Sequence, residues 1–282
     1  MVTPPESGTM DRFEELIAKA RQRKARSERL AAREIYPRVN GRNATGQLAG
    51  LFDPKIITSK RVLLGEDEHA EFRQRRIVAG LEDDDRVEPY RQLRTQLLKT
   101  MHDNKWSTLA VTSAHELAGK TLTAVNLAIC ISRDVNHTVL LVDLDLRTPT
   151  AHEKFNVEVK HGLIDYLSGR VRLEDALVYP GFQRLVVLPG RPVGRYSSEI
   201  LSSPQMAQFM SDYCSERNPS RIIIFDLPPL LRNDDALLFT PSVDATLLVV
   251  EDGVTTREQL EHSLALLKGR SNFIGTILNK AR

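Results

Sequence analysis

The chain has 282 residues, with 39 lysines and arginines against 37 aspartates and glutamates, and its formal net charge is only +2. This balance excludes binding to nucleic acid through a global basic field, and the length suffices for one sizeable core. Cys130 and Cys214 stand far apart, which argues against a disulfide framework and favours a reducing cytoplasm. No apolar run approaches the roughly 20 residues of a membrane span. The sequence therefore predicts a cytoplasmic protein that reaches a membrane only through a partner.

The first 86 residues are predicted to form an N-terminal helix and a flexible linker, followed by one domain over residues 87–282. Residues 11–33 have a short apolar stripe and then mixed basic and acidic side chains. Such a helix either docks on a partner or an anionic membrane surface, or is simply solvated. Residues 36–86 carry scattered Pro and Gly without a period, which indicates a linker with short ordered pieces.

A helix is predicted over residues 87–98, with Pro89 near its first turn. Glu88, Arg91 and Arg94 recur at every third position and form a polar row beside the apolar face. The spacing allows two interpretations: a weak salt-bridge ladder within the helix, or a contact between subunits.

Residues 107–128 have the order strand, tight loop and helix. The apolar run 109–111 suits a buried strand, the loop ends in Gly-Lys-Thr, and residues 122–128 have helical apolar spacing. This is the context of a phosphate-binding P-loop, where backbone N–H groups converge on an anion, the lysine reaches the outer phosphates and the threonine hydroxyl binds Mg²⁺. The residues expected to bind the nucleotide are Ala118, Gly119, Lys120, Thr121 and Leu122.

The loop departs from the full P-loop pattern. Ala114 stands five residues before Gly119, where the pattern has glycine, and the four residues between them include no glycine. A backbone that wraps a phosphate needs at least one residue at positive φ, which costs a residue with a Cβ roughly 1–2 kcal/mol. Glu116 adds a negative charge near the expected phosphate. On this motif alone, a chance Gly-Lys-Thr at a helix start remains the alternative.

Apolar strands alternate with helices in the rest of the chain. Further helices are predicted over residues 204–216 and 256–268, and further strands over residues 138–142, 185–188, 221–225, 245–250 and 273–278. Continuous apolar strands separated by helices indicate a sheet covered on both faces. The predicted fold class is therefore α/β, a doubly wound and mostly parallel sheet.

Three acids follow the ends of two of these strands. Asp143 and Asp145 come after strand 138–142, and Asp226 ends strand 221–225. The carboxyl ends of parallel strands meet at one edge of a sheet, where Thr121 also starts its helix. Taken alone, a strand-end aspartate is often a cap or turn residue. Together with Gly-Lys-Thr, the three carboxylates predict a Mg²⁺–triphosphate site.

The chain resembles the bacterial tyrosine kinases of capsule and exopolysaccharide production, a P-loop branch that includes septum-site and chromosome-partition ATPases. The similarity runs from about residue 88 to residue 280. It rests on the segments VTSAHELAGKTLTAVNLA, VLLVDLDLRTPTAH and IIIFDLPPLLRNDDALLF. The row Glu88, Arg91 and Arg94 also matches the family's oligomer-interface motif, so the resemblance implies a homo-oligomer.

The resemblance implies ATP and Mg²⁺ as cofactors. Lys120 would neutralise the β- and γ-phosphates. Thr121 and Asp226 would hold the metal, directly or through water. Asp143 or Asp145 would orient the metal shell or accept the proton of the attacking hydroxyl.

Two further residues are carried over from the resemblance. Arg147 would orient those carboxylates or meet phosphate, and Asn279 stands where related ATPases contact adenine. The resemblance also implies an inner-membrane polysaccharide co-polymerase as partner, whose cytoplasmic tail activates the kinase and recruits it to the membrane.

Two alternatives to an active kinase stay open. The first is a degenerate, non-catalytic kinase that regulates assembly. It is motivated by the glycine-poor loop and by the absence of a tyrosine cluster after Tyr213, the last tyrosine printed. The second is a partition-type ATPase, for which the sequence offers no basic stripe.

Overall fold

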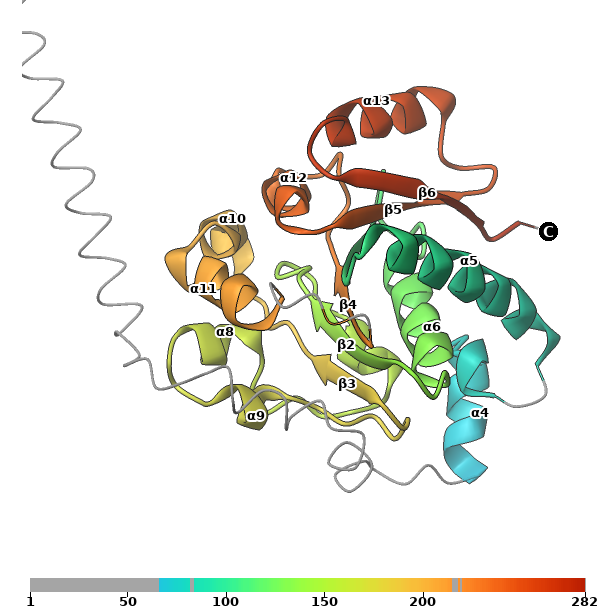
Figure 1. The fold of residues 1–282 in the computed structure, drawn as a ribbon, viewed down its shortest axis with the longest axis horizontal. Helices are drawn as coiled ribbons and strands as arrows, with labels where there is room; N and C mark the ends of the chain where they lie inside the picture. The colour runs from blue at the N-terminus through green and yellow to red at the C-terminus, as the bar shows by residue number, and fades with distance from the viewer. Residues whose placement is uncertain (1–65, 82–83, 215–217, 219, 282) are drawn as a thin grey trace, which may run out of the picture.

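The computed structural model describes residues 66–81, 84–214, 218 and 220–281, and it contains a six-stranded sheet in which every strand pair is parallel (Figure 1). The strands are β1 (Thr108–Ser113), β2 (Thr138–Asp143), β3 (Leu185–Leu188), β4 (Arg221–Asp226), β5 (Ala245–Glu251) and β6 (Asn272–Asn279). Their order in the sheet is β3-β2-β4-β1-β5-β6. The predicted fold class is confirmed, whereas the helix predicted over residues 11–33 lies outside the described residues.

The strands are apolar on both faces because both faces are covered. Along β2, Val139 and Leu141 belong to one buried cluster, whereas Leu140 and Val142 belong to the other. This alternation follows from the two-residue period of a strand. The first cluster packs against α4 (Glu66–Gln74), α5 (Glu88–Asn104), α6 (Lys120–Ser132) and α7 (Ala151–Lys154). The second packs against α8 (Leu163–Leu167), α9 (Leu173–Ala176), α10 (Ser197–Leu201), α11 (Pro204–Tyr213), α12 (Asp235–Phe239) and α13 (Arg257–Leu267).

Short 3-10 turns complete the described elements: η1 (Val78–Gly80), η2 (Asp85–Val87), η3 (Gly194–Tyr196) and η4 (Thr240–Ser242). The helix predicted over residues 87–98 extends to Asn104, where Lys105 ends it in the left-handed conformation. The helix predicted over residues 204–216 ends at Tyr213. Cys130 and Cys214 are buried and free. Among the described residues, no helix has the length and apolar character that crossing a membrane requires.

The segment that precedes residue 87 contributes to the same core. Phe72 and Ile77 are buried in the cluster that includes α6. Asn126 of α6 accepts a hydrogen bond from the backbone N–H of Ala79 and donates one to the carbonyl of Arg76, at 2.9 and 3.1 Å. Because a buried amide needs such partners, α4 and η1 are fixed against α6. Both elements lie within residues 36–86, the segment predicted to be a linker.

The sheet topology brings the candidate site together. Strand β1 is central, and β4 lies between it and β2. Asp226 at the end of β4 pairs in register with Asp143 of β2 and with Val111 of β1. The carboxyl ends of these three strands therefore form one edge, from which the loop between β1 and α6 starts.

Candidate active site

The loop between β1 and α6 leads directly into Gly119, after which α6 begins at Lys120. Gly119 has φ +97°, a conformation that favours glycine. A Cβ at this position would lie 2.0 Å from Nδ2 of Asn279, so the Asn279 side chain would have to move. The backbone conformation therefore favours glycine, and the packing accepts a larger residue only if Asn279 shifts.

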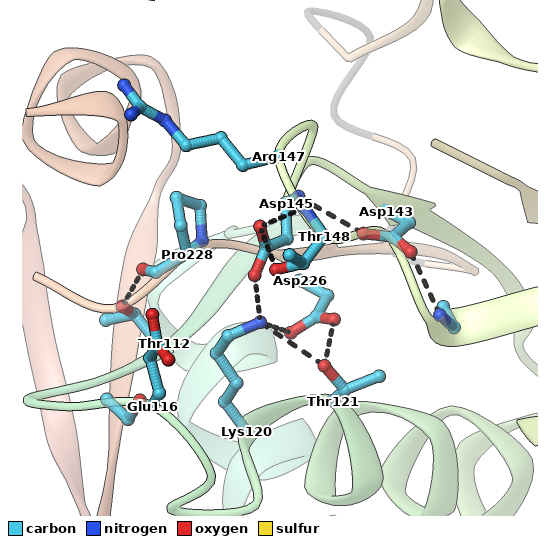
Figure 2. Close-up of polar contacts among 12 residues, drawn as sticks. Thr112, Glu116, Lys120, Thr121, Asp143, Asp145, Arg147, Thr148, Asp226 and Pro228 are labelled. Atoms are coloured by element: carbon cyan, nitrogen blue, oxygen red, sulfur yellow. Dashed lines mark hydrogen bonds and ion pairs between the residues drawn. The ribbon is translucent and has the colours of Figure 1, made fainter. Parts of the chain in front are cut away.

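The loop contains the predicted residue at positive φ, and this residue is not a glycine. Leu117 has φ +61°, and its side chain points into solvent with 86% of its surface exposed. The left-handed conformation costs a residue with a Cβ roughly 1–2 kcal/mol. Glu116 forms an ion pair with Arg232, so its charge has a cationic partner outside the Lys120 cluster. The Glu116 side chain lies beside, and not between, Lys120 and the strand-end acids (Figure 2).

Lys120 is the centre of the candidate site. Its ammonium lies 2.9 Å from Asp145 Oδ2 and 3.5 Å from Asp226 Oδ1, and the side chain is only 11% exposed (Figure 2). Thr121 Oγ1 donates a 2.6 Å hydrogen bond to Asp226 Oδ2 and accepts one from Lys120 Nζ at 3.3 Å. The predicted lysine, hydroxyl and carboxylates thus lie together at one edge of the sheet.

Backbone and side-chain donors fix the two acids that follow β2. Asp143 accepts hydrogen bonds from the backbone N–H groups of Asp145 and Ala151, at 3.1 and 2.9 Å. Asp145 accepts from both the N–H and the hydroxyl of Thr148, each at 3.1 Å. Asp145 therefore faces Lys120, whereas the carboxylate of Asp143 accepts a hydrogen bond from the first residue of α7.

The buried charges of this cluster shift one another's protonation. Burial and the neighbouring Asp226 raise the pKa of Asp143 from 3.8 to about 8. Burial likewise raises the pKa of Asp226, although Lys120 and the Thr121 hydroxyl act in the opposite direction. Burial alone would lower the pKa of Lys120, but Asp226, Asp145 and Asp143 outweigh it and raise that pKa. Crowding three buried carboxyl groups around one lysine disfavours their charged forms, and a bound cation would relieve that cost.

The donor atoms at this edge suit Mg²⁺ bound together with phosphate. Asp226 Oδ1 is buried and accepts no hydrogen bond from the described part of the chain, although the Lys120 ammonium lies 3.5 Å from it. Thr121 Oγ1 and the carboxylates are hard oxygen donors of the type that Mg²⁺ prefers. No group of three or more His, Cys, Asp and Glu among the described residues is arranged to hold a metal by itself. Mg²⁺ is commonly bound by one or two protein oxygens plus phosphates and water, so the residues fit a metal that arrives with a nucleotide.

Two predicted site residues, Arg147 and Asn279, have partners other than the strand-end acids. Arg147 points away from the acids in Figure 2, and its Nε donates to Ser197 Oγ and Asp235 Oδ2, each at 3.0 Å. It therefore connects the loop after β2 to α10 and α12, and no bond to the three strand-end carboxylates is formed. Asn279 Nδ2 donates to the carbonyl of Ala118 at 2.8 Å, which places this side chain against the phosphate loop.

The polar row on α5 is not a simple ladder. Glu88 and Arg91 form an exposed ion pair at 3.4 Å. Arg94 instead donates to the carbonyl of Cys130 on α6, also at 3.4 Å. The first two side chains remain available to a neighbouring subunit, and the subunit contact stays a prediction.

Several residues that shape the site are not among the site residues predicted from the sequence. Thr148 orients Asp145, Asp235 anchors Arg147, and Lys280 donates to the carbonyl of Leu117 at 2.8 Å. Thr148 lies three residues from its partner, so a local turn could have been proposed from the Asp-x-x-Thr spacing. The other two contacts join distant segments, and no local signal announces them.

Comparisons with known proteins agree with this geometry. The model of the CobQ/CobB/MinD/ParA nucleotide binding domain matches residues 109–282. The chain is 33% identical over 208 residues to the tyrosine-protein kinase YwqD of Bacillus subtilis, covering 73% of this chain and 86% of that protein. It is 29% identical to a putative tyrosine-protein kinase in the cps region of Klebsiella pneumoniae, of which it spans 31%. The solved kinase domain of the Escherichia coli tyrosine kinase ETK superposes with a TM-score of 0.62 at 29% identity, covering 71% of this chain and 79% of that one.

Proposed function

We propose a function on the basis of the family, because this chain belongs to the bacterial tyrosine-protein kinases built on the CobQ/CobB/MinD/ParA nucleotide-binding domain. In this proposal the chain binds ATP with Mg²⁺ and transfers the γ-phosphoryl group to tyrosine. The observation that carries the proposal is the position of Lys120, held by Asp145 at 2.9 Å and beside Asp226 and Thr121. A buried cation next to hard oxygen donors at a helix start is what a metal-bound triphosphate needs.

Each side chain has a distinct role in the proposed transfer. Lys120 neutralises charge on the terminal phosphates, and Asp145 keeps its ammonium in place. As the tyrosine oxygen bonds to the γ-phosphorus and the bond to ADP breaks, the hydroxyl proton passes to a carboxylate. Asp145 is better placed to accept it than Asp143, because Asp145 faces Lys120 whereas Asp143 is turned toward the start of α7. The gain in rate then comes from positioning and charge neutralisation.

Thr121 and Asp226 would hold the metal, directly or through water, with Asp143 supporting them. When bound, Mg²⁺ would supply positive charge that stabilises the phosphate oxygens. The backbone N–H groups at the start of α6 would contribute the remaining donors.

The biological setting of the proposal is capsule or exopolysaccharide production, as the relative from the cps region suggests. The exposed pair Glu88 and Arg91 supports assembly with further copies of the chain. An inner-membrane polysaccharide co-polymerase is the proposed activating partner, and the protein would be recruited from the cytoplasm to the membrane by it.

The test is phosphotransfer to a synthetic Glu–Tyr copolymer, followed with an antibody to phosphotyrosine. The purified chain should label the copolymer only with ATP and Mg²⁺, and Asp145→Asn should remove the signal while leaving nucleotide binding measurable. The exposed variant Lys268→Met serves as a matched control. Nucleotide binding without any labelling would reduce the protein to a regulatory module, and no binding at all would overturn the proposal.

A further inference from the structure

Side chains at the ends of β5 and β6 hold the phosphate loop from outside. Lys280 Nζ donates to the carbonyl of Leu117 at 2.8 Å and pairs with Glu251 Oε1 at the same distance. Next to it, Asn279 Nδ2 donates to the carbonyl of Ala118 at 2.8 Å. Two successive carbonyls of the loop are therefore fixed by two successive residues, the last residue of β6 and the one that follows it.

These contacts orient the loop peptides. A trans peptide is planar, with its C=O and N–H pointing in opposite directions. Because the Leu117 carbonyl is directed at Lys280, the N–H of Ala118 points to the opposite side. The bond from Asn279 to the Ala118 carbonyl orients the N–H of Gly119 in the same way.

The loop needs such support because it contains a strained residue. Leu117 sits at φ +61° with an exposed side chain, so its own packing does not hold it there. Strained backbone persists only where the surrounding structure over-determines it. The preceding residues are also tied, His115 to Thr255 at 2.8 Å and Glu116 to Arg232.

We infer that Lys280, assisted by Asn279, is a positioning residue that holds the phosphate loop in its anion-accepting shape. It keeps Leu117 in the left-handed conformation that a glycine at position 117 would adopt without strain. The inference rests on the proposed function, because the shape matters for binding a nucleotide phosphate. The side chain acts through the Leu117 carbonyl and is assigned no contact with the nucleotide.

The inference is tested with two readouts on the full chain. Amide hydrogen exchange of residues 114–119 is measured without nucleotide, and affinity is measured by titration with a fluorescent ATP analogue and Mg²⁺. Lys280→Ala should raise the exchange rates about tenfold and weaken binding about tenfold, which corresponds to about 1.4 kcal/mol. Arg257→Ala, which breaks an exposed ion pair on α13, should change neither.

Two further variants separate the loop contact from a general structural role. Glu251→Gln removes the ion pair but leaves the bond to Leu117, so its effect should stay below about twofold. In a Leu117→Gly background, the left-handed conformation is freely accessible, so Lys280→Ala should weaken binding by less than about threefold.

Three results would overturn the inference: unchanged loop exchange in Lys280→Ala, an equal effect of Glu251→Gln, or an undiminished loss in the Leu117→Gly background. If the wild-type chain binds no analogue, the proposed function fails. Hydrogen exchange then still decides whether Lys280 holds the loop.

Discussion

Removing the Lys120 ammonium should destabilise the nucleotide-free protein as well as abolish binding. In Lys120→Met, the methionine keeps most of the side-chain volume, but Asp145 and Asp226 lose the cation that lies 2.9 and 3.5 Å away. Breaking a buried ion pair from one side costs about 3–5 kcal/mol. For a domain of this size, that lowers the melting temperature by roughly 6–20 °C.

The loss should also depend on pH. The pKa of Asp143 is raised from 3.8 to about 8 in the folded chain, so the folded state binds more protons than the unfolded state between these values. Stability from this group therefore falls as pH rises through that window. Lys120 lowers the pKa of Asp143, so without it that pKa rises further and the stability keeps falling above pH 8. The loss of stability in Lys120→Met should therefore be larger at pH 9 than at pH 6. Differential scanning calorimetry at both pH values, with Lys268→Met as control, measures it. A melting temperature within about 1 °C of wild type would refute the reasoning.

Three other substitutions follow from the same contacts. Asp226→Asn should raise the melting temperature of the nucleotide-free protein, because burial disfavours its charged form, while removing the Mg²⁺ dependence of nucleotide binding; a lower melting temperature would contradict this. Gly119→Ala should abolish binding of a fluorescent ATP analogue, since φ +97° strains a residue with a Cβ and the Asn279 side chain would have to move, and measurable affinity would count against it. Arg147→Ala should lower the free energy of unfolding in urea by about 1–3 kcal/mol, because buried Asp235 keeps only hydroxyl partners for its carboxylate; an unchanged urea midpoint would contradict that role for Arg147.

The sheet and the central cluster could be predicted because their signals are local. Each strand is a short apolar run with an acid or a turn at its end, and Lys120 and Thr121 adjoin a recognisable helix start. Parallel strands then place Asp143 and Asp226 at the same edge of the sheet. The strand order, which was not predicted, makes them direct neighbours. The same logic predicted that the glycine-poor loop needs a residue at positive φ, which the structure shows at Leu117.

The contacts that could not be predicted join segments far apart in the chain. Arg147 meets Asp235 across 88 residues, and Lys280 meets Leu117 across 163. These contacts depend on how the loops pack at one edge of the sheet, and no periodicity or spacing in the sequence predicts that packing. For the same reason, the sequence alone could not show that Arg147 faces α12 instead of the strand-end acids.

The most direct test of the central claim is a calorimetric titration of the wild-type chain with ATP, with and without Mg²⁺, repeated with Asp226→Asn. The claim predicts saturable binding to one site per chain, strongly weakened when Mg²⁺ is omitted and insensitive to Mg²⁺ in the variant. Absence of saturable binding in the wild-type chain, or equal affinity with and without Mg²⁺, would contradict a metal–nucleotide site built around Lys120.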